Sequence, residues 1–166
     1  YNGMFKMAKR ADVIAAYRGV QSCVNGDALR NALLCMAAAP EAWFALRGHF
    51  ARSLAVFTVA SYIIGIGDRH LDNLLLRSDG RMLHVDFGFI LGFDPKPLPP
   101  AMRLSREMVD AMICVDELGY DQFIEHACAA YRVLRHHSRL FFSLFSLIAG
   151  TSLPQLKSEW ETHCFL

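Results

Sequence analysis

The chain is 166 residues long, with 54% hydrophobic and 20% charged residues, which is the composition of a packed globular domain and excludes a disordered segment. Its 17 lysines and arginines nearly balance 16 acidic residues, so the formal net charge of +1 gives no electrostatic reason to expect nucleic acid as a partner. The cysteines lack the close pairs of a zinc site, and we interpret all five as reduced thiols: Cys23, Cys35, Cys114, Cys128 and Cys164.

The first third of the chain is predicted to be helical. Apolar residues recur at helical spacing over residues 4–20, and Asn25-Gly26 interrupts the pattern. Asp27 is the predicted N-cap of a second helix over residues 28–38. A third helix is predicted over residues 40–64, because proline suits the first helical turn. The apolar stretch at its end, of about 14 residues, is too short to span a bilayer as a helix.

The middle of the chain changes character. Two apolar runs, residues 73–77 and 81–85, are separated by the turn signal Ser78-Asp79-Gly80, which predicts a small β-hairpin. Four prolines between Gly92 and Met102 exclude helix and predict an extended, semi-rigid loop.

Helical patterns resume in the last third. Ser105 is the predicted N-cap of one helix, and two more are predicted over residues 120–134 and 138–149, with Gly150 as the C-cap of the last. The predicted fold class is therefore mainly α with one small β-hairpin, that is, α+β.

Four polar residues around the hairpin point to phosphoryl transfer. This reaction needs magnesium held by carboxylate and amide oxygens, and a polar group that orients or deprotonates the acceptor hydroxyl. Asn73 and Asp86 can hold the metal, because strand pairing would bring both to one end of the hairpin. Asp68 and His70, on an irregular loop, can converge on one hydroxyl. Alternatively, Asp68, Asn73 and Asp86 are ordinary turn residues, but that interpretation does not explain why they occur at this spacing around the hairpin.

The two motifs together resemble the catalytic core of the phosphatidylinositol 3-/4-kinase superfamily, which includes the giant protein kinases related to it. The motifs are Gly67-Asp68-Arg69-His70-Leu71-Asp72-Asn73 and His84-Val85-Asp86-Phe87-Gly88. Asp-Arg-His reverses the His-Arg-Asp order of protein kinases. The resemblance implies the C-terminal lobe of a protein-kinase-like fold, with residues 1–166 as one partial kinase domain, 68–73 as its catalytic loop and 86–107 as its activation segment.

The resemblance also implies roles for individual residues. His70 would be the catalytic base, Asp68 would support the transfer, and Arg69 would organise the loop. Asn73 and Asp86 would ligate Mg²⁺ or Mn²⁺, with ATP as co-substrate. The implied cofactor-binding set is Asn73, Asp86, Phe87 and Gly88.

The acceptor is predicted from the segment that follows Asp86. Residues 88–109 resemble the activation segment of class III phosphatidylinositol 3-kinases. Within the loop only Lys96 and Arg103 are basic, too few to clamp several additional phosphates, so unphosphorylated phosphatidylinositol fits best as the bound substrate. Phe93 departs from the family, which commonly has a basic residue there, and could touch the bilayer interface. Lys96 touches substrate or is simply solvated.

Three functions stay open. The first is phosphorylation of the 3-hydroxyl of phosphatidylinositol, with the chain cytoplasmic and peripheral on endosomal membranes, bound to a regulatory protein subunit and connected with autophagy, all as the class III resemblance implies. The second is a Ser/Thr protein kinase of the related giant family, in DNA-damage or growth signalling, because residues 27–51 resemble the DNA-dependent protein kinase branch. The third is a non-catalytic remnant.

The ends of the chain favour a fragment. It begins with Tyr1 and has no basic-then-apolar leader, so we expect no signal peptide and a truncated N-terminus. The phosphate-covering loop and the strand lysine that this chemistry needs would lie upstream, and the closing membrane helix of the superfamily downstream. Negligible turnover is therefore expected of these residues alone.

Three further features have structural interpretations. His84 is interpreted as a buried structural histidine, and His136-His137 as a solvated helix junction rather than a phosphate site. The apolar residues Leu140-Phe141-Phe142 and Leu144-Phe145 are expected in the core rather than in a membrane.

Overall fold

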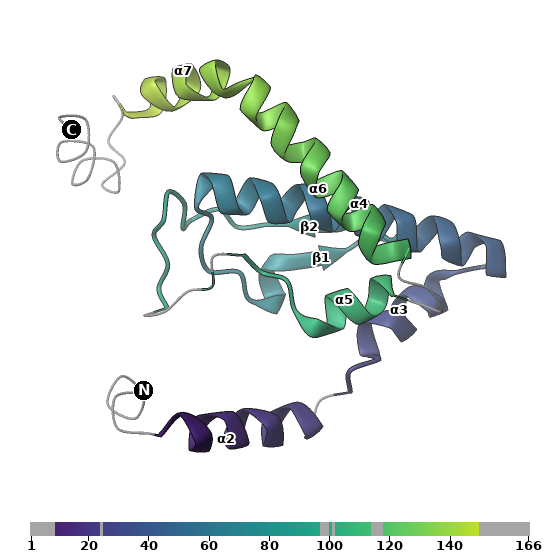
Figure 1. Ribbon diagram of the computed structural model, residues 1–166. Helices are drawn as coiled ribbons and strands as arrows, with labels where there is room; N and C mark the ends of the chain where they lie inside the picture. Colours follow the sequence, from purple (N-terminus) through teal and green to yellow (C-terminus); the bar gives the residue numbers. More distant parts are fainter. Residues whose placement is uncertain (1–8, 24, 97–99, 101, 114–117, 150–166) are drawn as a thin grey trace.

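The computed structural model describes residues 9–23, 25–96, 100, 102–113 and 118–149 (Figure 1). Within these ranges it is mainly helical with one two-stranded antiparallel sheet, so the predicted fold class is confirmed. The elements are, in chain order, α2 (Arg10–Cys23), α3 (Ala28–Met36), α4 (Pro40–Ile64), η1 (Leu71–Asn73), β1 (Leu74–Leu76), β2 (Met82–His84), α5 (Arg106–Met112), α6 (Leu118–His136) and α7 (Ser138–Ala149).

The core forms around the middle of α4. In Figure 1, α6 crosses α4, and the hairpin lies between α4 and α5. Apolar side chains from α3, α4, β2, α5 and α6 meet there. The largest side chains that are completely buried are Phe50, Leu33, Leu54 and Met112. This packing makes α4 the support to which the hairpin is attached.

Most helix ends follow the predicted signals. Pro40 lies in the first turn of α4, and Gly65 ends it in the left-handed conformation, with φ of 66°. The Ser105 hydroxyl accepts the backbone N–H of Met108 at 3.4 Å, so the predicted N-cap of α5 is confirmed. Asp27 lies at the N-cap position of α3, as predicted, but its backbone is already helical and its side chain makes no capping hydrogen bond.

Some boundaries differ from the predictions. Helix α2 continues to Cys23, beyond the predicted end at residue 20, and its predicted start lies outside the described residues. Helix α6 is longer than predicted by two residues at each end. The predicted cap at Gly150 lies outside the described residues.

The hairpin is fastened to α4 at three points. The His49 ring nitrogen Nδ1 lies 2.9 Å from the Asp79 carbonyl oxygen, and the Ser53 hydroxyl accepts the Met82 N–H at 2.9 Å. Gly80, at φ of 82°, lies so close that an added Cβ would be 2.5 Å from the Leu46 carbonyl oxygen. A residue other than glycine would push the turn off the helix.

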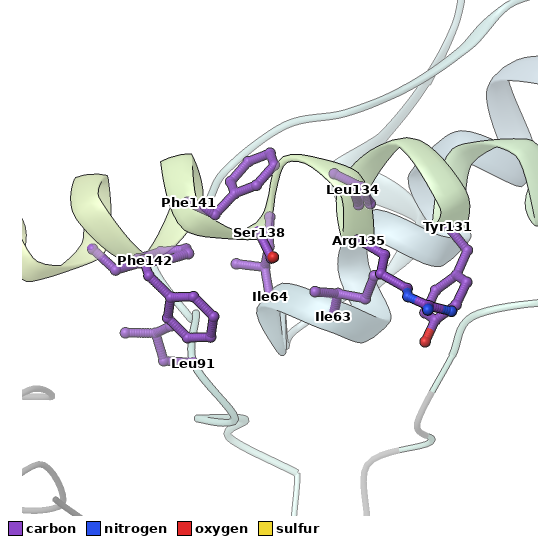
Figure 2. A pocket seen from close by; sticks show the side chains of 10 residues that line it. Ile63, Ile64, Leu91, Tyr131, Leu134, Arg135, Ser138, Phe141 and Phe142 are labelled. Carbon is purple, nitrogen blue, oxygen red and sulfur yellow. The ribbon is translucent and has the colours of Figure 1, made fainter.

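Helix α7 is only partly covered. A groove of about 440 Å³ lies between the end of α4, the end of α6 and α7 (Figure 2). Phe141 and Phe145 line it and are half-buried. The expectation that all the apolar residues between 140 and 145 lie in the core is wrong for Leu140, Phe142 and Leu144, which are exposed. Among the helices described, none is long and apolar enough to cross a membrane.

Candidate active site

The catalytic loop follows residues 65–67, and these residues lie against the start of the activation segment. The Gly67 N–H donates to the Phe89 carbonyl at 2.9 Å, and the Gly92 N–H donates to the Gly65 carbonyl at 2.9 Å. An added Cβ on Gly67 would lie 2.2 Å from the Phe93 carbonyl oxygen. Glycine at this position therefore allows the two segments to approach closely.

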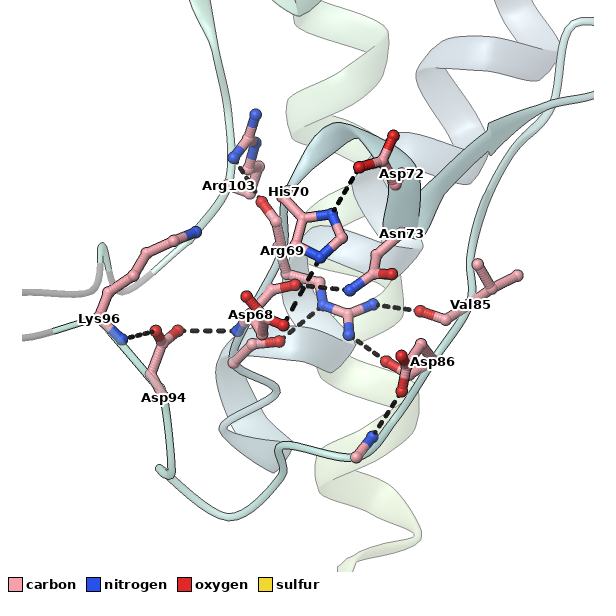
Figure 3. A network of polar contacts seen from close by, with 12 residues as sticks. Asp68, Arg69, His70, Asp72, Asn73, Val85, Asp86, Asp94, Lys96 and Arg103 are labelled. Carbon is pink, nitrogen blue, oxygen red and sulfur yellow. Dashed lines mark hydrogen bonds and ion pairs between the residues drawn. The ribbon is translucent and has the colours of Figure 1, made fainter.

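The hairpin brings Asn73 and Asp86 to one end, as predicted. Leu74 pairs with His84 in the antiparallel register, and the Val85 N–H donates to the Asn73 carbonyl at 3.0 Å. Figure 3 shows the amide oxygen of Asn73 directed to the side on which Asp86 lies. The last residue of the catalytic loop and the first of the activation segment are thus held at the same level.

Arg69 fixes these two segments to each other. Its buried guanidinium group donates to the carbonyl oxygens of Gly67 and Val85, each at 2.8 Å, and also to that of Asp86. The Phe87 ring covers the guanidinium, 5.6 Å from its centre. Three carbonyl acceptors satisfy a buried charge that would otherwise be costly, so the organising role predicted for Arg69 has a physical basis.

Asp68 and His70 lie side by side on this loop. His70 Nε2 is 3.6 Å from an Asp68 carboxylate oxygen. The backbone of Asp68 is left-handed, with φ of 51°, and its carbonyl accepts the Asn73 amide at 2.8 Å. Among the described residues, His70 Nδ1 is buried without a hydrogen bond, because the Asp72 carboxylate, at 3.6 Å, is too far away. A buried nitrogen without a hydrogen bond is unfavourable.

The side chain of Asp86 is exposed and available to a metal ion. One carboxylate oxygen accepts the Gly88 N–H at 3.1 Å, which leaves the other oxygen for a ligand. Within the described residues, no three His, Cys, Asp or Glu side chains gather into a metal site. One carboxylate and one amide nonetheless suit magnesium, which usually takes few protein ligands and completes its shell with phosphates and water.

The two predicted substrate-binding residues differ in their surroundings. Lys96 is exposed, and its backbone N–H donates to the Asp94 carboxylate at 2.8 Å. Arg103 is half-buried, and its guanidinium donates to the Arg69 carbonyl. The structure thus ties Arg103 to the catalytic loop, whereas the side chain of Lys96 extends from the activation segment (Figure 3).

The family described as phosphatidylinositol 3- and 4-kinase matches residues 3–158, nearly the whole chain. The chain belongs to the phosphatidylinositol 3- and 4-kinase family. The resemblance predicted from the two motifs is therefore confirmed.

Curated relatives agree with this assignment. The "Phosphatidylinositol 3-kinase, root isoform" of Glycine max is 54% identical over 112 residues, which cover 68% of this chain and 14% of the relative. The "Phosphatidylinositol 3-kinase catalytic subunit type 3" of Caenorhabditis elegans is 50% identical over 117 residues, 70% of this chain and 13% of the relative. The "Phosphatidylinositol 3-kinase VPS34" of Saccharomyces cerevisiae is 42% identical over 111 residues, 67% of this chain and 13% of the relative. The chain thus spans only a small part of the length of these relatives.

In this member of the phosphatidylinositol 3- and 4-kinase family, His84 is a structural residue, as predicted. It is buried, stacks on the Phe57 ring with centroids 4.7 Å apart, and lies 3.3 Å from the Ser61 hydroxyl. Burial, with the positive charges of Arg69 and Arg103, lowers the pKa of His84 to about 4. The imidazole is therefore neutral at pH 7, which suits its position beside two cations.

One residue at the site was missed from the sequence. Asp94 is half-buried, and its carboxylate accepts the backbone N–H of Asp68 at 2.9 Å. The only available signal was the Asp94-Pro95 pair, which is typical of a turn in which the aspartate accepts a backbone N–H two residues later. That local signal gives no indication of a partner in the catalytic loop.

Proposed function

We propose that this chain is the catalytic C-terminal lobe of a class III type phosphatidylinositol 3-kinase, which transfers the γ-phosphoryl group of ATP to the 3-hydroxyl of phosphatidylinositol. The observation that carries the proposal is that Asp68, His70, Asn73 and Asp86 gather where the hairpin meets the catalytic loop. The curated relatives, which are named phosphatidylinositol 3-kinases, support the choice of a lipid acceptor.

In this proposal His70 is the general base. Its imidazole removes the proton of the acceptor hydroxyl while that oxygen attacks the γ-phosphorus, and ADP leaves with the electrons of the broken bond. Asp68, 3.6 Å from Nε2, orients the ring and stabilises the imidazolium that forms.

Asn73 and Asp86 would hold Mg²⁺ or Mn²⁺. When bound, the ion would neutralise the charge that develops on the phosphates. The two ligands need to be positioned accurately, and the chain achieves this through Arg69, which bonds to the Asp86 carbonyl, and through the Asn73 amide, which donates to Asp68. Phe87 and Gly88 support this geometry by covering Arg69 and by donating to Asp86.

The activation segment supports a headgroup without additional phosphates. Lys96 and Arg103 are its only basic side chains between residues 89 and 103, and Arg103 already donates to Arg69. A polyphosphorylated headgroup would favour several cations, each pairing with one phosphate. We therefore assign Lys96 to the single phosphodiester of phosphatidylinositol.

The acceptor lies in a bilayer, so the reaction takes place at a membrane surface. We propose peripheral binding to that surface. The endosomal membrane and a regulatory protein subunit follow from the resemblance to class III enzymes and belong to the same proposal.

The test uses the longest natural product of the gene, with magnesium and labelled ATP. Vesicles that contain phosphatidylinositol should yield the 3-phosphate, identified by chromatography against the 3- and 4-phosphate standards. Vesicles of phosphatidylcholine alone serve as the control. Labelling of a Ser/Thr peptide without labelling of the lipid would contradict the proposal in favour of a protein kinase, and labelling of neither would favour a non-catalytic remnant.

A further inference from the structure

The carboxylate of Asp94 joins two functional loops. One oxygen accepts the N–H of Asp68, which lies 26 residues earlier, at 2.9 Å, and the other accepts the N–H of Lys96 at 2.8 Å (Figure 3). Both oxygens are therefore engaged with backbone groups. The Asp94 side chain thus fixes the position of Asp68 relative to Lys96. Asp68 orients the proposed base, and Lys96 is assigned to the lipid headgroup.

Asp68 needs such support because of its backbone conformation. Residues other than glycine seldom adopt the left-handed conformation, although aspartate tolerates it better than most. Asp94 binds its N–H, and the Asn73 side chain binds its carbonyl oxygen, so the residue is held from both sides. Without Asp94, Asp68 can relax to an ordinary conformation, and its carboxylate would then leave His70.

The chain also makes room for this contact. An added Cβ on Gly67 would lie 2.9 Å from the Asp94 carboxylate oxygen. A cavity of about 190 Å³ lies beside Asp94, lined in part by Ser61, Tyr62 and Phe93. Water can therefore enter when the carboxylate is removed, and a shorter side chain here leaves the core intact.

We propose that Asp94 is a positioning residue, which couples the part of the activation segment that carries Lys96 to the catalytic loop. The inference deepens the proposed function and rests on it. Its consequence is specific: loss of Asp94 separates Asp68 from Lys96 and so impairs the steps that involve the lipid most, while Asp86 keeps its contacts with Arg69 and Gly88.

The experiment compares Asp94→Ala and Asp94→Asn with the wild-type protein, in the longest natural product of the gene. Asp110→Ala is the matched control, because Asp110 pairs only with Arg106 on the surface of α5 in the described structure. Steady-state kinetics are measured twice, once with phosphatidylinositol vesicles as the varied substrate and once with ATP as the varied substrate. Thermal melting checks that each variant is folded.

For Asp94→Ala we expect kcat to fall roughly tenfold and the KM for phosphatidylinositol to rise roughly fivefold, whereas the KM for ATP stays within about a factor of two. Asp94→Asn keeps one acceptor oxygen and should give intermediate values. Asp110→Ala should match the wild type.

Two results would overturn the inference while the wild type phosphorylates the lipid. One is unchanged lipid kinetics in Asp94→Ala. The other is an equal rise of both KM values, which would indicate a general structural role. If the wild-type protein itself fails to phosphorylate phosphatidylinositol, the proposed function fails first, and the inference fails with it.

Discussion

The catalytic loop and helix α7 are held in place by different kinds of contact. In the catalytic loop, individual polar groups fix the backbone: Arg69 donates to three carbonyls, and Asn73 and Asp94 hold the peptide groups of Asp68. In α7, half-buried aromatic side chains face an apolar groove, and Leu147 is 73% exposed. The stabilisation from polar contacts of this kind depends on individual atoms, whereas the stabilisation from apolar packing is distributed over many atoms. Substitutions should therefore have different consequences in the two regions.

The largest effect is expected at Asp86, the proposed metal ligand. Asp86→Ala should lower kcat with phosphatidylinositol by about a thousandfold or more, because the developing phosphate charge loses its counter-ion. The melting temperature should fall only modestly, since within the described residues the exposed side chain accepts only the Gly88 N–H, although alanine suits the left-handed backbone here, with φ of 57°, less well than aspartate. The control is Asp121→Ala, a substitution of an exposed residue on α6, which should keep full activity. Activity that survives Asp86→Ala would contradict the metal assignment.

A smaller effect, on stability, is expected at Arg69. Lysine cannot reproduce the fork that reaches three carbonyls, so Arg69→Lys should lower the free energy of unfolding by about 2–4 kcal/mol. Urea denaturation measures this. Arg81→Lys is the matched control, because in the described structure the exposed side chain of Arg81 makes a surface ion pair with Asp79, at 3.6 Å, and the substitution should change stability by less than about 0.5 kcal/mol. Equal effects of the two substitutions would contradict the stabilising role of the three carbonyl contacts of Arg69.

A pH dependence is expected from His84. Its pKa is about 4 when folded, because of burial and the charges of Arg69 and Arg103, against about 6.5 when unfolded. Between these values the unfolded chain binds more protons, so stability falls as the pH falls from about 6.5 towards 4 and levels off below. The loss between pH 7 and pH 5 should be about 2 kcal/mol. Urea denaturation of His84→Gln, which cannot titrate, should show a shallower dependence, and an unchanged slope would contradict the assignment.

The smallest effect is expected in α7. Leu147→Ala should change the free energy of unfolding by less than about 0.5 kcal/mol. The same substitution at the fully buried Leu54 should cost about 2–5 kcal/mol. Denaturation of the two variants in parallel sharpens the comparison. A large loss at Leu147 would show that α7 is covered in solution by contacts beyond those described.

The sequence predicted features that depend on local chemistry. The turn at residues 78–80, the end of α4 at Gly65 and the cap at Ser105 each follow from one or two residues with strong preferences. The hairpin then placed Asn73 near Asp86, because antiparallel pairing leaves little freedom. The roles of these residues in catalysis stay predictions until the variants are measured.

Other features depend on partners distant in sequence. The bond from Asp94 to Asp68 links positions on either side of the hairpin, and no spacing rule predicts it. Asp27 lies at the N-cap position but makes no side-chain capping bond, because its own backbone is helical, with φ of −89° and ψ of 0°, whereas a capping residue is usually extended. The burial of residues 140–145 depends on what packs against them, which helical periodicity does not specify.

The register of the short hairpin limits changes in the length of the chain. One residue inserted into either strand would shift the pairing by one and turn the following side chains to the opposite face, so that Asp86 would no longer lie level with Asn73. An insertion in the turn would keep the register, but it would move Gly80 away from its close fit against Leu46. The stretch of gene that encodes these strands should therefore accept many substitutions and very few insertions or deletions.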